Sequence, residues 1–187
     1  MQIRNLTAAA LIVALSVAGC TTQTVESLSE SPTPSAAPPV FASEAEALEA
    51  ARAAYARYES VTDRILAEGG TRPERIAAVA IGKAYDDAIA GYETFRSEGY
   101  RLTGAPVATI TGLQSHSDGI ESPVVTAYLC LDIADTDVIN SQGDSVIDPE
   151  RPSLQSFVVE FNYNLAGDGS LALSSREGWD GNGVCDS

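Results

Sequence analysis

The sequence predicts an α+β domain in which N-terminal helices pack on a curved antiparallel sheet of about four to six strands. Two observations carry this prediction. Between residues 43 and 98 apolar residues recur every three or four positions, which is the period of an amphipathic helix. Beyond Gly99 apolar and polar residues alternate, which is the period of a half-buried strand. The 187 residues are enough for one domain with its own core.

The first helix is expected to begin at Ser43 and to end before Gly69 and Gly70. Ser43 followed by Glu46 has the spacing of a capping box, and glycine is typical just beyond a helix C-terminus. The residues expected to face the core share a spacing of three or four; they are Leu48, Ala51, Tyr55, Tyr58, Val61 or Thr62, Ile65 and Leu66.

A second helical region begins at Pro73, because proline is favoured in a first turn. Gly82 is expected to divide it into a short helix near 73–81 and a longer one near 83–97, which ends before Gly99. The inward stripe of the longer helix is Tyr85, Ala88, Ile89, Tyr92 and Phe95.

Four segments read as strands because they are rich in β-branched and aromatic residues. They are "PVATITGLQ", "ESPVVTAYLCLDI", "QSFVVEFNYNL" and "SLALSSREGW", and the last two flank the turn sequence "AGDG" of a hairpin. The stretch "ADTDVINSQGDSVIDPERPS" is expected to form a short hairpin or an extended loop.

Alternation assigns a face to each residue of the second and third strands. In the second strand the apolar set is expected to lie under the helices, and it comprises Val125, Ala127, Leu129, Leu131 and Ile133. Tyr128, Cys130 and Asp132 then face away. In the third strand the expected dry face is Phe157, Val159, Phe161, Tyr163 and Leu165, and the expected wet face is Val158, Glu160, Asn162 and Asn164.

Residues 1–19 are expected to be a signal peptide, because Arg4 precedes an apolar run too short to span a bilayer. Val17, Ala18, Gly19 and Cys20 resemble the bacterial lipoprotein box. That resemblance implies cleavage before Cys20 and a lipid anchor on its thiol, with acyl chains such as palmitate. The alternative is an ordinary secretory signal, which would leave an unpaired thiol in an oxidising compartment.

Residues 20–42 combine the expected lipidated cysteine with a tether rich in Ser, Thr and Pro, which cannot bury enough apolar surface to fold. Its reach is about 25 Å. Residues 43–187 are then one domain on the extracytoplasmic face of the cell membrane. The chain has 26 acidic and 11 basic residues, and Lys83 is its one lysine. The basic residues form no cluster, which argues against a nucleic-acid partner.

The remaining cysteines, Cys130 and Cys185, are expected to form a disulfide in the oxidising environment outside the cytoplasm. No CxxC spacing is present for redox chemistry. The acidic turns lack the ligand spacing of a calcium loop, and no nucleotide fingerprint is present, so neither a metal nor a cofactor is expected.

The order of helix, short helix, helix and antiparallel sheet resembles the cone fold of nuclear transport factor two and ketosteroid isomerase. The segments "RSEGYRLTGAPVATI", "AYLCLDI" and "GVC" are similar to those of exported actinobacterial lipoproteins of uncharacterised function. The resemblance covers residues 43–187 and implies a sheet that curves around a pocket, which such proteins use for catalysis or for binding, or fill with side chains.

No catalytic set is evident in the sequence. His116 is expected in an exposed turn, and the alternation places no carboxylate inside the cone. Tyr85, Tyr92 and Tyr163 are the candidate pocket residues. The leading hypothesis is therefore a non-catalytic binding or scaffold domain that engages an envelope protein or a small apolar ligand. The alternative is a cone-fold enzyme acting on a small hydrophobic substrate, with Tyr92 or Tyr163 as proton donor.

Overall fold

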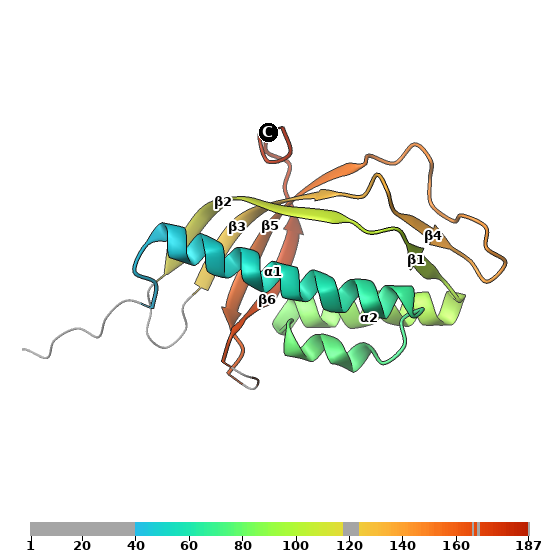
Figure 1. Ribbon diagram of the computed structural model, residues 1–187, viewed down its shortest axis with the longest axis horizontal. Coiled ribbons are helices and arrows are strands. Elements are labelled where there is room, and N and C mark those ends of the chain that lie inside the picture. Colours follow the sequence, from blue (N-terminus) through green and yellow to red (C-terminus); the bar gives the residue numbers. More distant parts are fainter. Residues whose placement is uncertain (1–39, 118–123, 166, 168, 187) are drawn as a thin grey trace, which may run out of the picture. The chain divides into compact units, whose positions relative to one another are not determined.

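Residues 40–117, 124–165, 167 and 169–186 are described by a computed structural model (Figure 1). They all belong to one unit of the chain, Ala37–Ser187. The predicted signal peptide, Cys20 and most of the predicted tether lie outside the described residues. Within that part, the structure confirms an α+β domain, with helices packed on antiparallel sheets.

Helix α1, Glu44–Ala67, begins where the capping box predicts. The Ser43 hydroxyl accepts a hydrogen bond from the Glu46 backbone N–H at 3.2 Å. The Glu46 carboxylate accepts one from the Ala42 backbone N–H at 2.6 Å, one residue before the usual position. The residues of α1 that are fully buried are Ala47, Ala51, Ala54, Tyr55, Tyr58 and Ile65, so much of the predicted stripe faces the core.

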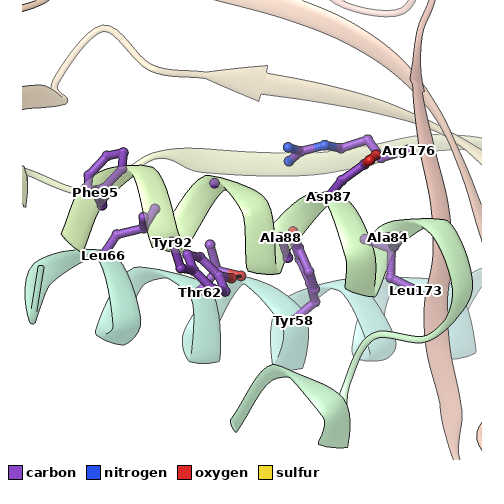
Figure 2. Close-up of a pocket in the computed structure, with 11 residues that line it drawn as sticks. Tyr58, Thr62, Leu66, Ala84, Asp87, Ala88, Tyr92, Phe95, Leu173 and Arg176 are labelled. Carbon is purple, nitrogen blue, oxygen red and sulfur yellow. Dashed lines mark hydrogen bonds between the residues drawn. The ribbon is translucent and has the colours of Figure 1, made fainter. Parts of the chain in front are cut away.

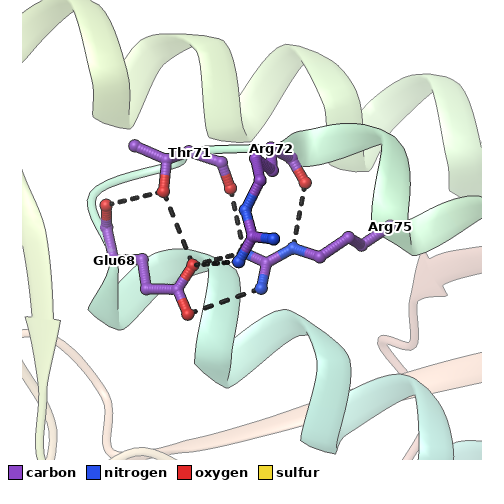
Figure 3. Close-up of polar contacts among 4 residues, drawn as sticks. All are labelled: Glu68, Thr71, Arg72 and Arg75. Atoms are coloured by element: carbon purple, nitrogen blue, oxygen red, sulfur yellow. Dashed lines mark hydrogen bonds and ion pairs between the residues drawn. The ribbon is translucent and has the colours of Figure 1, made fainter.

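The chain reverses after α1 through Gly69 and Gly70, which both adopt a positive φ. Figure 3 shows the polar contacts of this turn, in which the Glu68 carboxylate accepts hydrogen bonds from Arg75 at 2.6 and 3.4 Å. The Arg75 guanidinium thereby lowers the pKa of Glu68. Arg72 lies 3.7 Å from the same carboxylate. These contacts hold the end of α1 against the start of the next helix.

The second helical region divides at Gly82, as predicted. A 3₁₀ helix, η1, spans Pro73–Ala78, and α2 spans Gly82–Glu98. Gly82 has φ 53° and Gly99 has φ 70°, so glycine occupies a left-handed position at each end of α2. Ala84 and Tyr92 are fully buried, while Tyr85, Ala88 and Ile89 are partly buried against the core.

The main sheet is antiparallel and has the strand order β2, β3, β5, β6. A separate pair, β1 and β4, forms a small two-stranded sheet. The strands are β1 Arg101–Thr103, β2 Val107–Ser117, β3 Val124–Asp132, β4 Asp137–Ile139, β5 Leu154–Tyr163 and β6 Leu171–Gly178. Figure 1 shows the main sheet curving over α1, with α2 beside β6 and the β1–β4 pair near the C-terminal end of α1.

The inner face of the main sheet forms the core with the helices. Val125, Ala127 and Leu129 on β3 are fully buried, which confirms the predicted inward set for the body of this strand. Val125 lies opposite Phe161, and Ala127 lies opposite Val159. These cross-strand pairs of β3 and β5 therefore form part of the core between the sheet and α1.

Two face assignments just beyond the end of β5 were wrong. Leu165 was expected on the dry face but is 80% exposed, and Asn164 was expected on the wet face but is 5% exposed. The strand ends at Tyr163, so alternation no longer applies in the turn that follows. The Asn164 side chain instead donates a hydrogen bond to the Ala77 carbonyl at 3.1 Å and ties the turn to η1.

His116 was expected in an exposed turn, but it belongs to β2 and is half-buried. It lies opposite Val125, so it is on the inner face of the sheet. The centres of the His116 and Phe41 rings are 6.4 Å apart in a T-shaped arrangement. Phe41 was expected in the tether, but it is buried and belongs to the core.

The outer face of the main sheet carries the Cys130–Cys185 disulfide, whose Cα atoms are 5.1 Å apart. The predicted pairing is present in the structure. It holds the C-terminal segment against β3, where Val184 is buried. The centres of the Trp179 and Tyr128 rings are 5.3 Å apart. Tyr128 therefore lies on the outer face, as alternation predicts.

Candidate functional site

Two cavities meet between the helices and the sheet. The helical cavity, between α1, α2 and β6, has a volume of about 250 Å³ and is shown in Figure 2. The sheet-side cavity, between α1 and the segments around β1 and the end of β3, has a volume of about 200 Å³. Four residues line both cavities, namely Tyr58, Thr62, Leu66 and Arg176. The candidate site is the polar cluster at this junction.

Arg176 enters the junction from β6, where it lies opposite the inward-facing Val159. Its guanidinium carbon is 5.1 Å from the centre of the Phe157 ring, a cation–π distance. One guanidinium nitrogen lies 3.5 Å from the Tyr55 hydroxyl oxygen and donates to it. A guanidinium stays charged at physiological pH, so the junction holds a half-buried positive charge.

A β-bulge explains why alternation along β6 does not predict Arg176. Phe161 pairs with Leu173 whereas Glu160 pairs with Ser175, so Ser174 is an extra residue on β6. Leu173 faces inward before the bulge, and Arg176 faces inward after it, although strict alternation would place them on opposite faces. The Ser174 hydroxyl donates a hydrogen bond to the Glu160 carbonyl at 3.0 Å and fixes the irregularity.

Three tyrosines, Tyr55, Tyr58 and Tyr92, line the same cavities as Arg176. The rings of Tyr55 and Tyr58 are 5.6 Å apart, and the Tyr92 hydroxyl lies 2.9 Å from that of Thr62. Burial raises the pKa of Tyr55 to about 12, although the nearby Arg176 partly opposes this. Burial also raises the pKa of Tyr92. These two hydroxyls are therefore neutral hydrogen-bonding groups at physiological pH.

The three tyrosines proposed from the sequence do not come together. Tyr92 lines the helical cavity. Tyr85 on α2 and Tyr163 on β5 are half-buried and packed against the core, and neither lines either of the two cavities. The helical period predicts Tyr55 and Tyr58 only as core residues of α1, yet both side chains also line the site.

A pair of carboxylates lines the sheet-side cavity, which corrects the expectation that no carboxylate faces inward. Glu59 and Asp63 lie one turn apart on α1. One oxygen of Glu59, Oε1, is buried without a hydrogen-bond partner among the described residues. Apolar stripes along α1 do not predict such residues, because the cavity they line is completed by residues distant in sequence, such as Leu102 on β1 and Pro106.

The pKa of Glu59 is raised to about 7 from its ordinary value of 4.5. The main cause is burial, the charge of Asp63 adds to it, and the Ala108 backbone amide opposes it in part. Burial likewise raises the pKa of Asp63. Glu59 is therefore a proton acceptor or donor near neutral pH, in a cavity that two tyrosines and an arginine also line.

We expect the free energy of unfolding to fall as the pH rises from about 4.5 to about 7. A carboxyl whose pKa is higher in the folded state is stabilising while it is protonated, and this contribution is lost as the pH passes the folded-state value. Glu59→Gln should flatten the profile and raise stability at pH 8 by about 1 kcal/mol after solvent screening is allowed for. Urea unfolding at several pH values measures both effects.

Glu93→Gln is the matched control, because Glu93 is exposed on α2 and outside both cavities. It should leave the shape of the pH profile unchanged. A Glu59→Gln variant whose profile retained the wild-type slope would contradict the assignment of the titrating group.

Among the described residues, no three His, Cys, Asp or Glu side chains are grouped so as to hold a metal ion. In the same part of the chain, no helix is both long enough and apolar enough to cross a membrane.

No family model matches the sequence, and no curated protein matches it. Among solved structures, the intermembrane space region of chloroplast protein ARC6 is similar, with a TM-score of 0.50 and 9% sequence identity. The match covers 70% of this chain and 95% of that one. At this identity the similarity is one of fold alone.

Proposed function

We propose that this chain is a lipid-anchored domain of the cell envelope that binds a small ligand between its helices and its sheet. The supporting observation is the junction of two cavities at Arg176 and Tyr58, where apolar walls meet a few converging polar groups. Small-molecule sites usually have this mixed lining. The proposal retains the resemblance to the cone fold, whose members include binding proteins.

The anchor is proposed from the sequence around Cys20. The tether would keep the domain near the outer face of the membrane, and without Arg4 the mature chain has a formal charge of −16, which disfavours contact with anionic lipids. We expect Cys20→Ser to move the protein from the membrane fraction to the soluble fraction in a bacterial host. Mass spectrometry of the wild-type N-terminus should find a lipid adduct, and an unmodified Cys20 would contradict the anchor.

Ligand binding is tested by filling the helical cavity. Ala88 on α2 is half-buried and lines the cavity, so Ala88→Leu places three more carbon atoms in it. Mass spectrometry of small molecules released from the full chain, purified from its native host, should find a compound with the wild type and at least about tenfold less with Ala88→Leu.

Ala90→Leu is the control, because Ala90 is exposed on the same helix and does not line the cavity. It should retain the wild-type amount of ligand. A wild-type protein that releases no small molecule, but is crosslinked to an envelope protein in intact cells, would favour a scaffold function instead.

A second candidate function is acid–base catalysis, favoured by the raised pKa of Glu59 in a cavity that Tyr58 also lines. Glu59 would take a proton from a small hydrophobic substrate, and a tyrosine hydroxyl would donate a hydrogen bond to the developing oxyanion. Tyr92, proposed as donor from the sequence, lies on the other side of the junction with its hydroxyl beside Thr62. Conversion of the released compound by the wild type but not by Glu59→Gln would establish catalysis, whereas return of the compound unchanged would exclude it.

A further inference from the structure

We propose that the helical cavity binds a small carboxylate with an apolar body and that Arg176 is the partner of the carboxylate group. This inference rests on the proposed ligand-binding function and specifies the chemistry of the ligand. It follows from the contacts of Arg176, the charges around each cavity and the size of the helical cavity.

Arg176 has no carboxylate within ion-pair distance among the residues that the structure describes. Some other cations do have one; the Arg75–Glu68 and Lys83–Asp87 pairs, for example, are both 2.6 Å apart. A guanidinium has five N–H donors, and within the same part of the chain Arg176 uses one of them, in the 3.5 Å contact with Tyr55. A half-buried guanidinium with free donors is suited to bind a planar, bidentate anion.

The charges around the two cavities favour the helical one for an anion. Glu59 and Asp63 line the sheet-side cavity, and once the pH exceeds the raised pKa of Glu59 their negative charges would repel a carboxylate there. The helical cavity is lined by a single carboxylate, Asp87, which is exposed and already paired with Lys83. Among the side chains that line the helical cavity, Arg176 is therefore the charged group without an ion-pair partner in the described part of the chain.

The rest of the helical cavity is suited to an apolar body. Leu66, Ala88, Phe95 and Leu173 line it, and Figure 2 shows α1 and α2 side chains facing each other while Arg176 reaches in from β6. The Tyr58 ring forms part of the wall. At about 250 Å³ the cavity is smaller than a typical drug-sized pocket, so the ligand is small.

The test compares three probes that share one ring, namely benzoate, benzyl alcohol and benzylammonium, by calorimetry on the full chain. We expect wild-type protein to bind benzoate at least about tenfold more tightly than benzyl alcohol and not to bind benzylammonium measurably. Arg176→Gln should abolish the preference for benzoate. Arg52→Gln is the control, because it removes the same charge from an exposed position outside both cavities.

Three other variants keep the result interpretable if Arg176→Gln unfolds. Arg176→Lys retains the charge without the planar fork, so benzoate binding should weaken about tenfold but persist. Ala88→Leu should abolish benzoate binding, and Ala90→Leu should not, which locates the probe in the helical cavity.

Other outcomes overturn the proposal. Equal affinity for benzoate and benzyl alcohol, unchanged by substitution of Arg176, would show a ligand cavity without a carboxylate site, and the proposed function would stand. If benzylammonium binds more tightly than benzoate, the ligand is recognised by the carboxylates Glu59 and Asp63 and not by Arg176. If wild-type protein binds none of the probes, the carboxylate assignment is refuted. The proposed ligand-binding function is tested by a different measurement, which compares the compounds released by wild-type protein and by Ala88→Leu.

Discussion

Replacing Cys130 and Cys185 together by serine should lower the free energy of unfolding by about 4 kcal/mol. The disulfide joins residues 55 apart in the sequence, and in the chain-entropy model closure of a loop of this length restricts the unfolded chain by that amount. The bond also holds the C-terminal segment on the outer face of the sheet, where Val184 is buried. Its loss should expose Val184 and Trp179 to solvent, which fluorescence of the one tryptophan would detect.

Denaturant unfolding with and without a reducing agent provides the control. Reduction should lower the unfolding midpoint of the wild type and leave that of the double serine variant unchanged. Two free thiols at these positions in the exported protein, or a double variant as stable as the oxidised wild type, would contradict a structural role for the bond.

Local signals in the sequence were sufficient to predict most of the elements. Ser43 and Glu46 mark the start of α1, and Gly82 and Gly99 mark the ends of α2, because each of these positions imposes a specific backbone conformation or cap. The apolar alternation of β3 identified its buried face, since a strand covered on one side leaves a clear period of two.

The candidate site was not predictable in the same way. Arg176 faces inward because a bulge at Ser174 changes the parity of β6, and no local pattern signals that shift. Glu59 shares its cavity with Leu102 on β1 and Pro106 just after it, and β1 pairs with β4, more than thirty residues away. Such contacts depend on tertiary arrangement, which propensity and periodicity do not encode.

Gly70→Ala should destabilise the domain by at least about 3 kcal/mol, because two penalties act together. Gly70 has φ 73°, a left-handed conformation that costs an alanine about 1–2 kcal/mol. A Cβ there would also lie 2.1 Å from the Tyr92 carbonyl oxygen, so the end of α1 and the middle of α2 would have to separate. Thermal and urea unfolding measure the loss.

Gly143→Ala separates the two penalties, because Gly143 also has a positive φ but its Cβ would meet no atom within 4 Å. It should cost only the conformational penalty, about 1–2 kcal/mol. Equal costs at the two positions would show that the approach of α1 to Tyr92 is not tight. Since the Tyr92 hydroxyl lies 2.9 Å from that of Thr62 in the wall of the helical cavity, Gly70→Ala should also weaken benzoate binding, whereas Gly143→Ala should not. A glycine outside the cavity therefore fixes the spacing of the helices on which the proposed binding site depends.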